Sequence, residues 1–316
     1  MMAAAKLQTG LIGAGHLGRL ILSQLADLPE FDVVGYYDRD MILASKVPEL
    51  APCQAFPNAG SLIEASQAVI LAVPTPFHYP YAREVILKQR HLFIEKPIAE
   101  TLKEAREICQ WAEQYPHLVV QVGHVERFNP AWQSLAEMNL QPMFIEAHRL
   151  APFSHRGTDV SVILDLMIHD LDLVLQLIPF PVREIRANGV ALLSSSPDIA
   201  NARLEFSHGA VANLTASRVS QKKMRTMRLF QKDTYVSLDF LKKSRTMLCM
   251  TPVGSEAFVM EPSKENPLRD ELLAFANAIN ENGSPVVSAR DGYRALDLAT
   301  EILEVIAGNT NSQLRP

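Results

Sequence analysis

The 316-residue sequence has few cysteines and no long uninterrupted run of apolar residues. Its cysteines, Cys53, Cys109 and Cys249, are odd in number and far apart, so we expect neither a disulfide framework nor a structural metal site. No stretch reaches the roughly 18 consecutive apolar residues that a transmembrane helix needs, and residues 1–6 lack the apolar core of an export signal. These absences predict a cytoplasmic protein with no membrane partner.

Charge of one sign is not concentrated anywhere in the chain. Its 30 Lys and Arg residues and 35 Asp and Glu residues are spread along the whole length, for a formal net charge of -5. The chain therefore lacks the basic stripe that a nucleic-acid backbone requires, and no nucleic-acid partner is expected. The 48% hydrophobic content is enough, at this length, for a separate core in each of two domains.

The first part of the chain alternates short strand-like runs with helical stretches. Its expected strands are 7–12, 33–37, 68–73, 91–94 and 118–122, and its expected helices are 17–28, 79–88 and 102–114. Such alternation is typical of the α/β class with a doubly wound parallel sheet. We therefore predict a Rossmann dinucleotide-binding domain over residues 1–122.

The second part has a different pattern. Its expected helices are 130–138, 163–178, 268–280 and 292–306, and its expected strands are 144–150, 182–193, 202–206, 210–217, 227–230, 235–240 and 247–250. Asn129 is the expected N-cap of the first of these helices. Because short turns join most of the successive strands, we predict an open, mostly antiparallel sheet backed by helices, in a second α/β domain over residues 123–316.

A glycine-rich loop, Gly13-Ala14-Gly15-His16-Leu17-Gly18, directly follows the first strand and opens a helix. Glycines in this setting allow a tight turn and let backbone N–H groups approach a pyrophosphate. The next strand ends at Asp38, about 20 residues beyond the loop, where a carboxylate accepts hydrogen bonds from the ribose hydroxyls of a dinucleotide. Its charge repels a 2′-phosphate and favours NAD over NADP, although Arg39 beside it partly offsets the repulsion.

Two further segments end strands of the same expected sheet, at the edge where ligands of open α/β sheets bind. One is Val73-Pro74-Thr75-Pro76-Phe77-His78, in which His78 contacts the cofactor or, as the alternative, is a capping or surface histidine. The other is Glu95-Lys96-Pro97, which points a lysine toward the nicotinamide. The predicted cofactor-binding residues are Gly13, Gly15, His16, Leu17, Gly18, Asp38, Arg39, Val73, Thr75, His78, Glu95 and Lys96.

Three polar side chains share one face of the otherwise apolar helix expected at 163–178. They are Asp165, His169 and Asp172, at positions i, i+4 and i+7. Charge in such a helix is costly unless the groups pair or face a cleft. The alternative for His169 is a hydrogen-bonded core residue, and Asp170 and Asp172 are expected to be structural capping or pairing groups.

The Glu95-Lys96-Pro97 and Asp165-x-x-x-His169-x-x-Asp172 motifs, with the glycine loop, resemble the Gfo/Idh/MocA family of NAD(P)-dependent oxidoreductases. Segments 266–269 and 288–292 also resemble that family's last two helices, so the resemblance covers nearly the whole chain. It implies a dehydrogenase that acts on a CH–OH group of a carbohydrate-like substrate. It also implies that the second domain binds substrate and mediates assembly into a homodimer or homotetramer.

Matched residue by residue, the family's catalytic lysine falls on Lys96, its histidine on His169, and the acid before it on Asp165. An imidazole suits proton transfer near neutral pH, so His169 is expected to remove the substrate's hydroxyl proton. The resemblance assigns Lys96 to hold the same hydroxyl and stabilise charge on its oxygen, and Asp165 to orient substrate or imidazole. The roles of Lys96 and His169 are interchangeable at this stage.

The run Gly123-His124-Val125-Glu126-Arg127-Phe128-Asn129-Pro130, with residues 165–170, most resembles the branch of the family that oxidises the 3-hydroxyl of UDP-N-acetylglucosamine. The 3-keto product of that branch is aminated for a lipid A precursor, which implies a downstream aminotransferase as partner. Arg127, Arg149 and the segment Ser154-His155-Arg156 could form a cationic pocket for a diphosphate or carboxylate. Pairing of the arginines with neighbouring carboxylates is the alternative.

Other functions stay open at this level. One is oxidation of a free sugar or inositol by the same catalytic groups. Another is a non-catalytic dinucleotide or sugar sensor, and a third is reduction of a bilin on the same architecture. These functions stay open because function on a shared fold is set by variable loops. Turnover with a nucleotide sugar, turnover with a bilin, and dinucleotide binding without turnover are the results that would distinguish a nucleotide-sugar dehydrogenase, a bilin reductase and a sensor.

Overall fold

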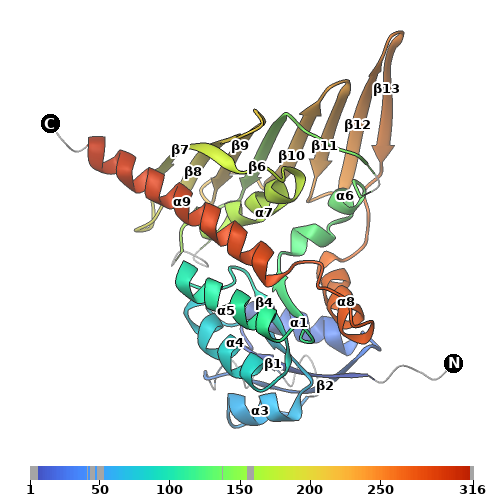
Figure 1. Cartoon of the computed structure of the whole chain (residues 1–316), viewed down its shortest axis with the longest axis vertical. Coiled ribbons are helices and arrows are strands. Elements are labelled where there is room, and N and C mark those ends of the chain that lie inside the picture. The colour runs from blue at the N-terminus through green and yellow to red at the C-terminus, as the bar shows by residue number, and fades with distance from the viewer. Residues whose placement is uncertain are drawn as a thin grey trace. The chain divides into compact units, whose positions relative to one another are not determined.

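The computed structural model describes residues 6–40, 42, 47, 53–136, 138–154 and 160–313. Figure 1 labels the helices and strands in chain order. The chain divides into two compact units, which are Met1–Val125 with Asn266–Tyr293, and Glu126–Glu265 with Arg294–Pro316. The predicted contiguous division at residue 122 did not include the return of Asn266–Tyr293 to the first unit.

The first unit is built on a five-stranded parallel sheet with strand order β2-β1-β3-β4-β5. The strands are β1 (Leu7–Ile12), β2 (Phe31–Tyr37), β3 (Ala68–Leu71), β4 (His91–Glu95) and β5 (Val120–Gly123). The helices are α1 (His16–Ala26), α3 (Ala59–Ala65), α4 (His78–Leu87), α5 (Leu102–Gln114) and α8 (Pro267–Asn280). The predicted Rossmann architecture is confirmed, and the short helix α3 was not predicted.

Burial explains why the short central strands form. All four side chains of β3 are fully buried, as a parallel sheet covered on both faces requires. Helix α8 joins this unit because its apolar face, with Leu272 and Phe275, packs into the same core as Ile21 and Leu22 of α1. The Phe275 ring also meets Phe93 of β4 edge to face, with ring centroids 5.8 Å apart.

The second unit contains an eight-stranded sheet with strand order β13-β12-β11-β10-β6-β9-β8-β7. The strands are β6 (Phe144–Leu150), β7 (Val182–Val190), β8 (Ile199–Phe206), β9 (Val211–Ser217), β10 (Met224–Gln231), β11 (Thr234–Asp239), β12 (Ser244–Thr251) and β13 (Gly254–Met260). Only the β6–β9 pair is parallel among these described strands. The predicted open, mostly antiparallel sheet is therefore confirmed.

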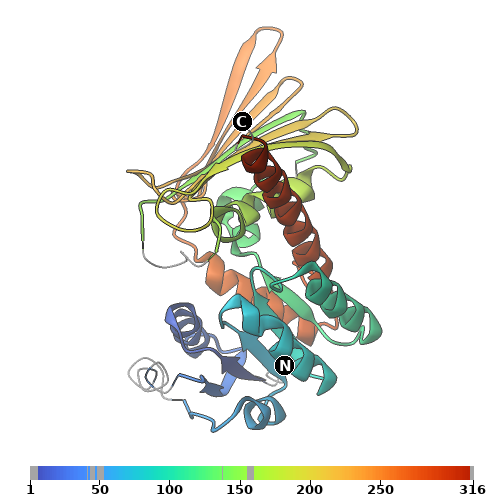
Figure 2. The same cartoon turned by 90° about the vertical axis from the view of Figure 1, so that its left-hand side faces the viewer.

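Helices cover one face of this second sheet. Helix α7 (Ile168–Leu177) and the part of α9 (Ala289–Gln313) that belongs to this unit lie against it, as Figures 1 and 2 show. Their buried side chains, including Leu171 and Ile302, share a core with the inward-facing side chains of the strands. In β6 the inward positions are Ile145, Ala147 and Arg149, because side chains alternate between the two faces of a strand.

The helix predicted at 130–138 is shorter in the structure. Helix α6 spans Pro130–Gln133, and Asn129 caps it by accepting a hydrogen bond from the Ala131 N–H at 3.1 Å, as predicted. Beyond it the Ala136 and Met138 N–H groups donate to carbonyls three residues earlier in the chain, at 3.0 and 2.9 Å. Such i→i+3 bonds make tight turns and do not extend an α-helix.

A fully buried carboxylate, Asp198, organises the connection between β7 and β8. Its Oδ2 accepts the N–H groups of Leu192, Leu193 and Ser194 at 2.7, 2.6 and 3.1 Å, and its Oδ1 accepts Nε of Arg218 at 2.8 Å. Burial alone would raise the pKa of Asp198, but the Leu193 N–H, the Arg218 guanidinium and the Leu192 N–H together hold that pKa well below its usual range.

Replacing Asp198 with alanine is expected to lower the free energy of unfolding by about 3 kcal/mol, because a buried arginine loses its charge partner. Since the folded pKa is lowered, the contribution of the ionised carboxylate is present above the unfolded pKa and is lost as pH falls through the folded pKa. Urea unfolding of both proteins at neutral pH and near pH 3 measures this, and the difference should shrink in acid. An equal difference at both pH values would contradict the assignment.

Candidate functional site

The glycine loop of the first unit has little space for side chains except at one position. Gly13 has φ of +102°, and a Cβ there would lie 2.4 Å from the carbonyl oxygen of Ala72. A Cβ at Gly18 would lie 1.9 Å from the carbonyl oxygen of Gly13, so Gly18 serves the packing of α1 on the loop. A Cβ at Gly15 would meet no heavy atom within 4 Å, and Gly15 lines a pocket.

This local geometry fits a dinucleotide pyrophosphate. Gly15 is the N-cap of α1, and it makes no side-chain cap hydrogen bond. The first turn of α1 carries no acidic side chain that would repel an anion. The open space at Gly15 and the N-terminal N–H groups of the helix together provide the kind of cradle in which phosphates bind.

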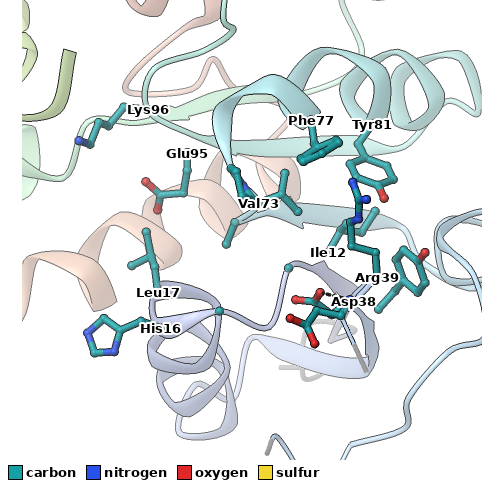
Figure 3. Close-up of a pocket in the computed structure, with 16 residues that line it drawn as sticks. Ile12, His16, Leu17, Asp38, Arg39, Val73, Phe77, Tyr81, Glu95 and Lys96 are labelled. Carbon is teal, nitrogen blue, oxygen red and sulfur yellow. Dashed lines mark hydrogen bonds between the residues drawn. The ribbon is translucent and has the colours of Figure 1, made fainter. Parts of the chain in front are cut away.

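The pocket has a volume of about 610 Å³ and extends along the carboxyl edge of the sheet (Figure 3). Figure 3 shows Glu95, Lys96 and Leu17 toward one end of it, and Asp38 and Arg39 toward the other. The predicted residues that line it are Gly13, Gly15, His16, Leu17, Asp38, Arg39, Val73, Glu95 and Lys96. The first unit therefore brings most of the predicted cofactor residues to one pocket.

Asp38 is held in place by the backbone of the loop. Its Oδ2 accepts the Ala14 N–H at 2.6 Å, and its Oδ1 accepts the Asp40 N–H at 2.8 Å. The Arg39 guanidinium stacks over the Phe77 ring at 4.7 Å from the centroid. These contacts fix a carboxylate, a cation and an aromatic ring together at one end of the pocket.

Three predicted cofactor residues, Gly18, Thr75 and His78, lie outside the pocket lining. His78 is buried, and its Nδ1 and Nε2 lie 2.8 and 2.9 Å from the carbonyl oxygens of Pro97 and Val73. It begins α4, and because it is buried the surface alternative is wrong, whereas its contact with the cofactor stays a prediction. Burial lowers the pKa of His78, and the ring links the end of β3 to the segment after Lys96.

Several lining residues were missed by the sequence reasoning, namely Ile12, Tyr37, Asp40, Ala72, Pro74, Phe77 and Tyr81. Phe77 and Tyr81 had a usable signal. Phe77 lies in the 3₁₀ turn Thr75–Phe77, and Tyr81 follows one helical turn later in α4. Both lie in the connection and helix that follow β3, at the edge of the sheet where ligands of open α/β folds bind.

Glu95 is the buried carboxylate of this pocket, with 8% of its surface exposed. Burial raises the pKa of Glu95 to about 7, and the neighbouring charge of Lys96 opposes the rise. Because the folded pKa lies above the unfolded value, stability associated with the protonated form is fully present below the unfolded pKa. It is lost as pH rises toward and through about 7.

A Glu95→Gln variant, which stays neutral at every pH, is therefore expected to lose less stability than the wild type between about pH 5 and pH 8. The difference should be on the order of 2 kcal/mol, because each unit of pKa shift corresponds to about 1.4 kcal/mol and part of the shift to about 7 lies below pH 5. Thermal unfolding across this range measures it. Parallel losses in both proteins would show that Glu95 does not change its charge there.

The predicted residues of the second unit lie on a helix that does not begin as an α-helix. Residues Ile163–Met167 form a π-helical turn, in which the Ile168 N–H donates to the Ile163 carbonyl, and α7 follows directly. The prediction of a regular α-helix is wrong for this turn, so Asp165 and His169 are not related by regular α-helical spacing. Both side chains are half-buried. Single π turns are rare and frequently occur at functional sites.

The two arginines of the predicted cationic pocket are buried and matched by carboxylates. Nε and Nη2 of Arg127 both lie 2.7 Å from the Asp172 carboxylate, and those of Arg149 lie 3.0 and 2.7 Å from Asp170. This is the pairing alternative that the sequence left open, and it confirms the structural roles predicted for Asp170 and Asp172. His155 and Arg156 lie outside the described residues.

The structure does not place all the catalytic candidates in one unit. Lys96 lies in the first unit, and Asp165 and His169 lie in the second.

Within the described ranges, no group of three or more His, Cys, Asp or Glu side chains could hold a metal ion. No helix in that part of the chain is long and apolar enough to cross a membrane.

Two family models match the chain. Residues 7–124 match a Gfo/Idh/MocA model described as an oxidoreductase family with an NAD-binding Rossmann fold. Residues 143–234 match the Gfo/Idh/MocA C-terminal domain.

The chain is also similar to individual proteins. It is 35% identical over 305 residues to the UDP-N-acetylglucosamine 3-dehydrogenase of Acidithiobacillus ferrooxidans, covering 94% of this chain and 96% of that protein. A crystal form of that enzyme matches with a TM-score of 0.90 over 96% of this chain and 98% of its own. Scyllo-inositol dehydrogenase from Lactobacillus casei, solved with NAD(H) and scyllo-inositol, shares the fold with a TM-score of 0.81, covering 96% of this chain and 98% of that one at 17% identity.

These matches agree with the motifs and with the pocket. The family models cover the glycine loop, Asp38 and Lys96 in the first unit, and Asp165 and His169 in the second. The relative from A. ferrooxidans extends the match to nearly the full length. This chain therefore belongs to the Gfo/Idh/MocA family of oxidoreductases and is a dehydrogenase with a nicotinamide dinucleotide cofactor.

Proposed function

We propose that this protein uses NAD to oxidise the 3-hydroxyl of UDP-N-acetylglucosamine to a 3-keto sugar. The observation that carries the proposal is that Lys96 lines the same pocket as the glycine loop and Asp38, so a lysine accompanies the dinucleotide site. The substrate is suggested by the 35% identical relative, which is named for that reaction and matches over nearly the full length.

The choice of NAD over NADP rests on Asp38. Its carboxylate is held by the Ala14 and Asp40 N–H groups, so it cannot easily turn away from a bound ribose. A carboxylate there accepts hydrogen bonds from the two ribose hydroxyls and repels a 2′-phosphate. Arg39 is already stacked on Phe77, which reduces its freedom to pair with a phosphate.

The proposed chemistry is removal of a proton and a hydride from one CH–OH group. Bound nicotinamide dinucleotide supplies the hydride acceptor. His169 takes the hydroxyl proton as general base. Lys96 Nζ donates a hydrogen bond to the same oxygen and stabilises the negative charge that develops there, while Asp165 orients the substrate or the imidazole. The exchanged assignment, with Lys96 as base, uses the same groups and conserves the same atoms.

We further propose that the protein acts as a homodimer or homotetramer together with an aminotransferase. Oxidation of an alcohol by NAD alone is often unfavourable near neutral pH, so a reaction that consumes the ketone is needed for net flux. An aminotransferase converts the 3-keto group to an amine and thereby removes the product.

A substrate panel tests this function. NADH formation is measured with UDP-N-acetylglucosamine and, in parallel, with free sugars and inositols, each with and without an amine donor and a 3-keto-sugar aminotransferase. Turnover restricted to the nucleotide sugar is expected. Turnover only with an unphosphorylated sugar or inositol would support the dehydrogenase activity and contradict UDP-N-acetylglucosamine as the substrate. Dinucleotide binding without any turnover would favour the sensor alternative.

A further inference from the structure

Two buried arginine–carboxylate pairs hold α7, the helix that carries His169. In one pair, Nε and Nη2 of Arg127 donate hydrogen bonds to the Asp172 carboxylate, and the two side chains are 7% and 2% exposed, respectively. In the other pair, Nε and Nη2 of Arg149 donate hydrogen bonds to the Asp170 carboxylate, and the two side chains are 2% and 4% exposed, respectively. Each pair is bidentate, so it fixes the orientation of the carboxylate as well as its distance.

The two carboxylates flank His169 around the helix axis. With 3.6 residues per turn, Asp170 lies about 100° from His169 in one direction, and Asp172 lies about 60° away in the other. The arginines come from different elements, because Arg149 belongs to β6 and Arg127 to the 3₁₀ turn Val125–Phe128. Rotation of α7 in either direction would therefore break one of the two bidentate arginine–carboxylate ion pairs.

Each guanidinium also donates through its third nitrogen. Nη1 of Arg149 donates at 2.6 Å to Glu126, which lies outside α7, whereas Nη1 of Arg127 donates at 2.7 Å to Gln176, a second side chain of α7. Glu126 also accepts from Asn129, at 3.0 Å, whose side chain donates at 3.0 Å to the carbonyl of Phe240. The Arg149 guanidinium is thus held by contacts outside α7, and Arg127, which belongs to the Val125–Phe128 turn, holds two side chains of α7.

The turn before α7 explains why the rotation of the helix needs to be fixed by these two ion pairs. Residues Ile163–Met167 are π-helical, a rare geometry in which side chains do not follow the regular spacing of an α-helix. Asp165 lies within this turn and His169 directly beyond it. A helix free to rotate would change the relation between these two side chains.

We propose that Arg127 and Arg149 are positioning residues, which set the rotation of α7 and thereby the direction of the His169 imidazole. This inference rests on the proposed role of His169 as the base. It differs from the direct substrate contact expected from the sequence, because a positioning role lowers the rate of the chemical step and leaves substrate affinity nearly unchanged.

The test compares the wild type with lysine variants, which keep the positive charge and lose the two parallel hydrogen bonds to the carboxylate. Arg127→Lys and Arg149→Lys are expected to lower kcat at least about tenfold, with KM within about threefold of the wild type. Arg218→Lys is the matched control, because Arg218 is equally buried in a pair with Asp198 that does not involve α7. It should lose stability and keep kcat. A rise in KM at constant kcat would overturn the proposal in favour of substrate contact.

A second variant guards against failure to fold. Arg127→Leu combined with Asp172→Leu removes both charges of one pair, a change that buried ion pairs often tolerate. It is expected to fold and still show the loss of kcat, and wild-type kcat in this folded variant would overturn the proposal.

A readout that does not depend on activity separates this inference from the proposed function. Histidine-selective NMR labelling, with the His169 signal assigned from His169→Asn, reports the surroundings of the imidazole. The signal should shift or broaden in Arg127→Lys and Arg149→Lys and stay unchanged in Arg218→Lys. An unchanged His169 signal in the first two variants would overturn the positioning role. If wild-type protein did not turn over UDP-N-acetylglucosamine but the signal still shifted, only the proposed function would fail.

Discussion

Replacing Lys96 or His169 with alanine is expected to lower turnover at least about 100-fold, the low end of what general acid–base groups contribute. Dinucleotide affinity should change little, because the glycine loop and Asp38 provide most of the proposed cofactor contacts. Steady-state kinetics with UDP-N-acetylglucosamine and fluorescence titration with NADH measure the two quantities separately.

Lys88→Ala and His117→Ala are the matched controls for that experiment. Lys88 is an exposed lysine of the first unit that pairs with Glu64 at 2.7 Å, and His117 is an exposed histidine beside Gln89. Both controls should keep wild-type turnover. Unchanged turnover in both Lys96→Ala and His169→Ala would reject the proposed catalytic groups.

Replacing Asp38 with serine is expected to lower the preference for NAD over NADP about 100-fold. Hydrogen bonds to a charged group contribute about 1.5 to 3 kcal/mol, so losing the carboxylate should lower kcat/KM for NAD by about 10- to 100-fold. The same change removes the repulsion of a 2′-phosphate and leaves Arg39 able to attract it. The ratio of kcat/KM for the two cofactors is the quantity to measure.

The matched control for the cofactor preference is Asp32→Ser. Asp32 is an exposed carboxylate in β2, the strand that Asp38 directly follows, and it does not line the pocket. Its replacement should leave the cofactor ratio unchanged. If Asp38→Ser also left the ratio unchanged, Asp38 would not determine the choice of cofactor.

The regular elements were predictable because periodicity and local signals agree there. Strand β1, helix α5 and strand β6 have the predicted bounds. In α5, Thr101 and Glu104 form a capping box that marks the helix start. In β6, alternate burial follows from the alternating directions of side chains in a strand.

Strand β13 and the packing partner of α8 were not predicted, because local signals for them are weak or lacking. Strand β13 is at the edge of the sheet, and its side chains are mostly exposed, so Gly254–Met260 shows no burial pattern that a periodicity argument could use. The apolar residues of α8 identify a buried face but do not say which core it joins. Its packing against α1 depends on contacts between residues far apart in the chain.

The site was predictable in residue type and only partly in arrangement. The glycine loop and Asp38 were found because their spacing relative to the strands is tied to dinucleotide binding, and Lys96 was found because it ends a strand at the same edge of the sheet and matches a motif of the family. The partners of Arg127 and Arg149 were left open, because no local pattern says which of several nearby acidic residues a buried arginine meets. The π turn before His169 was missed because its composition does not differ from that of an α-helix.

Transfer of deuterium from a labelled substrate tests the central claim most directly. The protein is incubated with NAD and UDP-N-acetylglucosamine that carries deuterium at C3, with an amine donor and an aminotransferase to remove the ketone. Mass spectrometry of the reduced cofactor should then show one deuterium gained from the sugar, and none when the label is at C4. Reduced cofactor without deuterium from C3 would show that the proposed carbon is not oxidised, and no reduction of NAD at all would contradict the proposed function.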